Sequence, residues 1–168
     1  PTASAPAPSG GPEPKTGAEF ARRAAAEASR REFQPAIADY GKAIELEPDN
    51  GAFYRARAMV RLNARQPVLA MADLDQALTR KPDDPEALMR RGELYLSTRD
   101  PVRAKADFDA AMKLEPNNSS LIAQAGNAYA RAGLYEPAIH ELDLWIAAHP
   151  RDEDLPRALA SRCYARAT

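Results

Sequence analysis

The sequence has few of the residues on which catalytic and metal sites depend. It contains one cysteine, Cys163, and two histidines, His140 and His149, among 168 residues. A single cysteine cannot form an internal disulfide, which excludes a small secreted fold held together by disulfides. We expect Cys163 to be a small buried apolar residue, with a reactive thiol as the alternative.

Long apolar runs and a strong charge of either sign are also missing. The formal net charge is −1, which gives no electrostatic reason to expect nucleic acid as a partner. No segment approaches the roughly 18–20 apolar residues that a membrane-spanning helix needs, so membrane insertion is not expected. The joint abundance of alanine and arginine resembles proteins of GC-rich bacteria. The compartment stays open between cytoplasm and periplasm.

The motifs of the common enzyme classes are absent as well. His140-Glu141 could begin a zinc-binding HExxH motif, but Leu144 stands where the second histidine would be. No glycine-rich phosphate loop occurs, and neither histidine has a metal-ligand partner at helical spacing. The sequence therefore predicts a protein that is not an enzyme and that carries no metal or cofactor.

Proline is plentiful, and the N-terminal segment has so many prolines that it cannot form a regular helix. Residues 1–14 contain five prolines and no large apolar side chain. Such a segment has nothing to bury, so we expect residues 1–16 to form an extended linker or tail. The chain does not begin with methionine, which favours a fragment or a processed form of a longer protein.

A repeat with a period of 34 residues follows this segment. The prolines Pro48, Pro82, Pro116 and Pro150 close four similar endings and lie 34 residues apart each time. The blocks are 17–50, 51–84, 85–118 and 119–152. The twentieth place of every block is alanine, and a large apolar residue follows four places later. Because spacings of three and four share one side of a helix, each block predicts two short helices and no strand.

The residue pattern of these blocks resembles the tetratricopeptide repeat. A large apolar residue comes first, then a small residue, tyrosine, alanine, an aromatic residue, alanine and proline at the 34-residue period. The resemblance covers residues 17–152 and implies an all-α fold, a right-handed α-solenoid of helix-turn-helix units. Residues 153–168 have the length of one more first helix, which would either cap the last repeat or open a fifth one. That end of the chain, from Leu142 onward, also resembles repeats that follow retroviral-type aspartyl protease domains in some bacteria.

Two charged columns depart from the apolar pattern. The seventh place, usually leucine in the family, is arginine in three blocks, and the twenty-third place is always acidic. We expect the acids to form a solvated face, with pairing to neighbouring arginines left open, because residues about 10 Å apart cannot share one metal ion. The arginines are expected to lay their stems over the core with the charge outward, a phosphate-binding row being the alternative. The columns are Arg23, Arg57 and Arg91, and Asp39, Asp73, Asp107 and Glu141.

The family resemblance implies that the first helix of each repeat lines a concave binding groove. In repeat one these places are mostly alanine. Ala21 and Ala25 stand where some members of the family have residues of a Lys/Asn/Arg clamp that binds the C-terminal carboxylates of heat-shock chaperones, so this clamp is not expected here. Apolar residues on a solvent-facing wall favour a partner that covers them, and charged and amide groups around them would fix its backbone and charge. The expected peptide-binding residues are Arg55, Met59, Leu62, Met89, Glu93, Leu96, Asn127 and Arg131.

These residues predict a scaffold that binds an extended or helical peptide segment of another protein. Two alternatives stay open at this point. The repeats could associate with copies of the same chain through the groove or the C-terminal end. They could also form a regulatory arm of a larger bacterial protein, joined through the proline-rich segment, for instance one that carries a protease.

Overall fold

The structure, a computed structural model, describes residues 13–116 and 118–148, together with 150, 151, 153, 155, 156, 159, 160, 162 and 163. The described part is helical and contains no strand, as the repeat pattern predicted. Most of the proline-rich segment and His149 lie outside the described residues. The helices are α1 (Gly17–Ser29), α2 (Phe33–Leu46), α3 (Gly51–Asn63), α4 (Pro67–Arg80), α5 (Pro85–Ser97), α6 (Pro101–Leu114), α7 (Ser119–Arg131) and α8 (Tyr135–Ala148).

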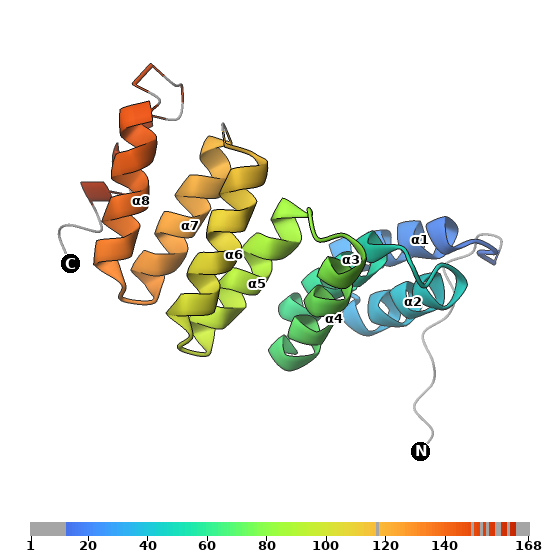
Figure 1. Ribbon diagram of the computed structural model, residues 1–168. Coiled ribbons are helices and arrows are strands. Elements are labelled where there is room, and N and C mark those ends of the chain that lie inside the picture. Colours follow the sequence, from blue (N-terminus) through green and yellow to red (C-terminus); the bar gives the residue numbers. More distant parts are fainter. Residues whose placement is uncertain are drawn as a thin grey trace.

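The helices form four antiparallel pairs that stack one after another, with α1 and α8 at opposite ends of the row (Figure 1). Each pair consists of the first and second helix of one 34-residue block. Between the pairs, α3 packs on α2, α5 on α4, and α7 on both α5 and α6. The result is an α-solenoid, in which each repeat contacts mainly its neighbours.

The ends of the helices follow from the residues that close each block. The last residue of a block caps the next first helix, because its side-chain oxygen accepts a backbone N–H that has no partner inside the helix. Asn50 accepts from Ala52, Asp84 accepts from Ala87, and Thr16 forms a capping box with Glu19. Pro67 and Pro101 open second helices, where a missing N–H costs little.

The core consists of the columns that define the repeat. The alanines of the twentieth place, Ala36, Ala70, Ala104 and Ala138, are fully buried. Small residues at the eighth place let the two helices of a pair approach closely. A Cβ atom added to Gly92 would lie 2.5 Å from Cε1 of Phe108, which leaves room for no other residue without movement. Phe108 also meets Tyr129 of the next repeat edge-on, with ring centroids 5.3 Å apart.

The described residues beyond α8 cover the last repeat. Trp145, Leu142 and Ile122 form a buried cluster against which Leu155 packs. Arg162 donates a hydrogen bond of 2.9 Å from Nη1 to Oδ1 of Asp143. Cys163, however, is exposed, so the prediction of a buried apolar cysteine was wrong.

The turn between the two helices of each repeat uses left-handed backbone. In the fourth repeat this place is Gly133, with φ 74°, as expected of a position that favours glycine. In the other three repeats it is arginine: Arg31, Arg65 and Arg99 have φ of 63°, 58° and 63°. A residue with a Cβ atom costs about 1 kcal/mol or more in this region, so three repeats retain a strained arginine where glycine would fit.

Candidate functional site

The candidate site is the surface formed by the exposed side chains of α1, α3, α5 and α7, which we call the first-helix face. Arg55, Met59, Leu62 and Asn127 are partly exposed on it, and Arg131 is exposed. The side-chain amide of Asn127 makes no hydrogen bond to another described residue. These five side chains are accessible to a ligand, and their role in peptide binding stays a prediction.

Two of the expected contact residues are not on the surface. Met89 and Leu96 are only 1% and 8% exposed, so the prediction that both project from a solvent-facing wall was wrong. The reason is that α5 packs directly against α7. Both side chains belong to the same buried cluster as Leu121 and Ala128 of α7. They can form the floor of a site but not its walls.

Ion pairs connect the charged residues of the face across repeat boundaries. Arg55 of the second repeat donates a hydrogen bond of 2.9 Å from Nε to Oδ2 of Asp84, the residue that caps α5. It also pairs with Glu86 in the first turn of α5, in the third repeat. Glu93 of the third repeat pairs with Arg131 of the fourth at 3.4 Å. These side chains therefore hold neighbouring repeats together, and a ligand would have to compete with or extend these pairs.

Two hollows open along this face. The first, of about 430 Å³, is lined by residues from α3, α5 and α7, including Arg55, Met89 and Gln124. We call it the α3–α5–α7 hollow. The second, the α5–α7 hollow, measures about 340 Å³ and is lined by Glu93, Leu96, Ser97, Arg99, Ala128, Arg131 and Ala132.

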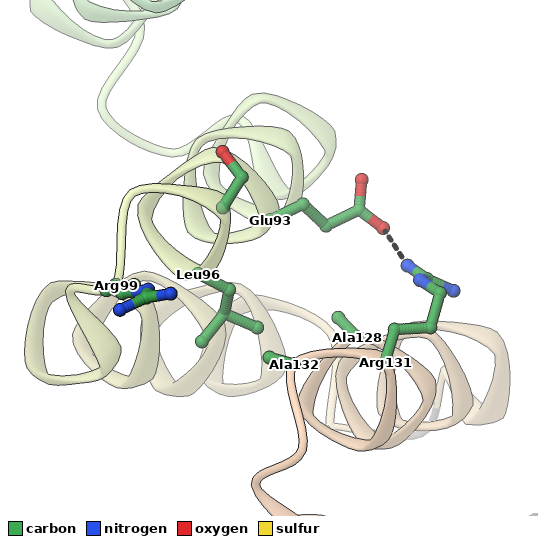
Figure 2. A pocket seen from close by; sticks show the side chains of 7 residues that line it. Glu93, Leu96, Arg99, Ala128, Arg131 and Ala132 are labelled. Carbon is green, nitrogen blue, oxygen red and sulfur yellow. Dashed lines mark hydrogen bonds and ion pairs between the residues drawn. The ribbon is translucent and has the colours of Figure 1, made fainter.

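The α5–α7 hollow has an apolar floor and a charged rim. Figure 2 shows Leu96 between Arg99 and Arg131, with the small side chains of Ala128 and Ala132 beside it. Glu93 reaches Arg131 across one side. An apolar anchor could therefore lie on Leu96 while the arginines contact an anionic or carbonyl group.

The charged columns inside the repeats have a structural role. Arg23 pairs with Asp39, Arg57 with Asp73 and Arg91 with Asp107, each through two hydrogen bonds across the helices of one repeat. The acids are buried, so the prediction of a solvated acidic face was wrong. The guanidinium groups point at these carboxylates and not outward, which leaves the alternative of a phosphate-binding row without support. Hydrogen bonding to Asp107 raises the pKa of Arg91.

The fourth repeat shows how these columns depend on each other. Ala125 replaces the arginine there, so Glu141 has no cation within its own repeat. Lys105 of the third repeat approaches Glu141 at 3.5 Å instead, while also pairing with Asp109 at 2.9 Å. Loss of the intra-repeat pair is thus offset by a contact between repeats.

Two groups of unusual residues received no role from the sequence. The eleventh place, tyrosine in later repeats, holds Glu27 and Arg61 in the first two. Glu27 is buried, its Oε2 has no hydrogen-bond partner among the described residues, and burial, with a smaller contribution from Asp39, raises its pKa. The other group is Arg31, Arg65 and Arg99. The sequence did contain a signal for this second group. The fifteenth residue of each block is arginine in the first three repeats and Gly133 in the fourth.

Other functional features are sparse in the part of the chain that the structure describes. No group of three or more His, Cys, Asp or Glu side chains there could hold a metal ion. His140 is exposed on α8. Of the described helices, none has the length and hydrophobicity to cross a membrane.

Comparisons with known proteins agree on one family. The model of a family described as tetratricopeptide repeat matches residues 85–118. No curated protein matches the sequence significantly. Three solved structures share the fold of this chain. The first domain of Spaghetti (RPAP3) bound to the HSP90 peptide SRMEEVD has 21% identity and a TM-score of 0.63, covering 70% of this chain and 90% of its own.

Two further structures are similar, and one of them extends the likeness over more of the chain. The tetratricopeptide domain of Arabidopsis OM64 is 26% identical with a TM-score of 0.62, covering 70% of this chain and 93% of its own. The MamA protein is 18% identical with a TM-score of 0.71, covering 89% of this chain and 80% of its own. The fold is shared well beyond the single matched repeat.

Proposed function

Because the chain is a tetratricopeptide-repeat protein, a fold that points to protein–protein interaction, we propose that its first-helix face binds a peptide segment of another protein. The observation that carries this proposal is the α3–α5–α7 hollow, to which three successive first helices contribute. A surface shared by three repeats suits an extended or helical segment, because such a ligand contacts several repeats at once.

The chemistry of the face favours a ligand with apolar anchors. Met59 and Leu62 are partly exposed on α3, and the floors of the two hollows include Met89 and Leu96. Methionine adapts its shape to varied partners, which suits a binding floor. Asn127 offers an amide that can both donate to and accept from a peptide main chain.

The charges of the face argue against a purely acidic ligand in the groove. The RPAP3 domain binds a peptide rich in glutamate and aspartate. Here the first repeat contributes Ala21 and Ala25 at the places where the resemblance implies residues of a Lys/Asn/Arg clamp, and Arg55 is already paired with Asp84 and Glu86. We therefore propose a segment of mixed charge, with Glu93 and Arg131 contacting opposite charges of the ligand.

The test is selection of binding peptides from a displayed random library, followed by calorimetry with the selected peptide. Leu62→Glu combined with Asn127→Ala is expected to weaken binding at least about tenfold, since it places a charge on the apolar wall and removes the amide. The matched control is Val68→Glu, because Val68 is 81% exposed on a second helix. Equal binding by both variants, each shown by circular dichroism to be folded, would contradict the proposed face.

The competing assignment is self-association through the same groove. It predicts that the mass of the native chain in sedimentation experiments rises with concentration, and that the Leu62→Glu, Asn127→Ala variant remains a monomer. A native chain that stays monomeric while it binds the selected peptide would support the peptide-binding proposal.

A further inference from the structure

Three arginines occupy the same place in consecutive repeats, at the turn between first and second helices. We call Arg31, Arg65 and Arg99 the turn arginines. Each has left-handed backbone, which arginine rarely adopts, while Gly133 forms the same turn in the fourth repeat. The fold can therefore make this turn with glycine, and the turn itself gives no reason for an arginine. A strained residue retained at equivalent places suggests a role for its side chain.

No carboxylate of the described residues pairs with the turn arginines. All three are exposed, and none forms an ion pair with a described residue. The acids at these turns already have other partners: Glu32 pairs with Arg30 at 2.9 Å, and Asp100 pairs with Arg103 at 3.4 Å. The second turn, residues 64–66, contains no acid. One positive charge is therefore left over at each of three successive turns.

The row of turn arginines ends at a hollow of the first-helix face. Arg99 lines the α5–α7 hollow, on the other side of Leu96 from Arg131 (Figure 2). A ligand that contacts the turns can therefore continue into a recess with an apolar floor and a further cation. Arg99 thus belongs both to the row of turn arginines and to the lining of this hollow.

We propose that the turn arginines dock an extended acidic segment of a partner protein, with one carboxylate at each turn. We take equivalent turns of stacked repeats to recur at roughly the 8–10 Å that separates packed helices. A polyproline-type helix has three residues per turn and rises about 3.1 Å per residue. An acid at every third residue therefore lies on one side of such a segment at about 9 Å intervals, matching the arginines.

The chemistry of arginine supports a carboxylate ligand. Its planar guanidinium group can donate two parallel hydrogen bonds to a carboxylate. A nucleic acid fits the surface less well, because phosphates of one DNA strand recur every ~3.4 Å of duplex and the row offers a charge only about every 10 Å. The chain's formal net charge of −1 also opposes a long polyanion. This docking edge lies beside the peptide groove and does not require that the groove binds a ligand.

The test uses fluorescence anisotropy with two labelled peptides of equal composition. One repeats Glu-Pro-Pro, and the other holds its glutamates in one block. The test variant carries Arg31→Gly, Arg65→Gly and Arg99→Gly, since glycine suits the left-handed turns and keeps the fold. The control variant carries Lys15→Gln, Arg22→Gln and Lys113→Gln, which removes three exposed, unpaired cations from other places.

We expect the native chain to bind the repeating peptide more tightly than the block peptide. The test variant should lose at least about tenfold in affinity, and the control variant less than about twofold. Equal losses in both variants, equal affinity for both peptides, or no binding by the native chain would overturn the proposal. Tighter binding of an oligothymidine that is lost in the test variant would overturn the assignment to a peptide.

Discussion

Arg57 on α3 donates two hydrogen bonds to Asp73 on α4, from Nε to Oδ2 at 2.9 Å and from Nη2 to Oδ1 at 2.7 Å. Arg61, one turn later on α3, approaches the same carboxylate at 2.7 Å. Asp73 is 3% exposed. One buried anion thus compensates two guanidinium groups, and its removal leaves more charge unpaired than removal of either arginine.

This arrangement predicts unequal costs for the two partners of one ion pair. Asp73→Leu should lower the free energy of unfolding by about 3–5 kcal/mol, the usual cost of breaking a buried pair. Arg57→Leu should cost clearly less, because Arg61 still compensates Asp73. Urea unfolding followed by circular dichroism measures both.

The third repeat supplies the control for this comparison. Its eleventh place is Tyr95, so no second arginine of α5 backs up Arg91 beside Asp107. Arg91→Leu and Asp107→Leu should therefore have costs closer to each other than the two replacements in the second repeat. An Arg57→Leu variant that loses as much stability as Asp73→Leu would show that Arg61 gives no compensation.

Glu27→Gln is expected to raise the melting temperature by a few degrees at pH 7. Burial raises the pKa of Glu27 above its ordinary value of 4.5, so ionisation of this group opposes folding. Below pH 4.5 the carboxyl is protonated in both folded and unfolded chains and exerts no penalty. The penalty grows as the pH rises from 4.5 through the folded-state pKa and is then constant.

Thermal melts of the two proteins at several pH values check this prediction. The difference in melting temperature should be present at pH 7 and absent near pH 3. The matched control is Glu45→Gln, because Glu45 is exposed on α2 and pairs with Lys42. A gain for Glu27→Gln that is the same at both pH values would show that the carboxylate charge is not the cause.

The parts of the fold that follow from local pattern could be predicted from the sequence, and those that depend on neighbouring repeats could not. The helix pairs follow from periodicity, caps and prolines. Met89 and Leu96 were expected on an exposed wall because a repeat considered alone leaves them uncovered. They are buried because α7 packs on α5, and Leu121 and the small residue Ala128 of the next repeat belong to the same buried cluster.

The arginine and aspartate columns show a similar limit. Each column looked like exposed charge because its members in successive repeats lie too far apart to interact. The partner of each arginine is 16 residues later in its own repeat, across the helix pair. Only the packing of the two helices against each other shows that the side chains at the seventh and twenty-third places of a repeat come into contact. The direction of these side chains therefore had to come from the structure.

Two glycine replacements should change stability in opposite directions. Gly92→Ala is expected to cost about 1–3 kcal/mol, because the new Cβ atom would lie 2.5 Å from the buried ring of Phe108. Gly41→Ala should stabilise by up to about 1 kcal/mol, since alanine favours helix and the nearest atom, Nη1 of Arg57, is 3.8 Å away. Chemical denaturation of both variants measures the contrast. A stable Gly92→Ala protein would mean that α5 and α6 can separate without loss of packing.

Arg65→Gly should raise the free energy of unfolding by about 1 kcal/mol, because glycine adopts the left-handed turn without the steric cost that arginine meets. Gly133→Ala is the reverse control. Nothing lies within 4 Å of an added Cβ there, so any loss of stability comes from the backbone angle φ of 74° and not from a clash.

Denaturant unfolding of both variants, with peptide binding measured on the same samples, separates the effect of the arginine on stability from its effect on binding. A variant that becomes more stable and binds the repeating acidic peptide less tightly would show that the arginine is kept for its ligand. If Arg65→Gly leaves stability unchanged, the turn does not strain arginine, and the argument from strain to function fails.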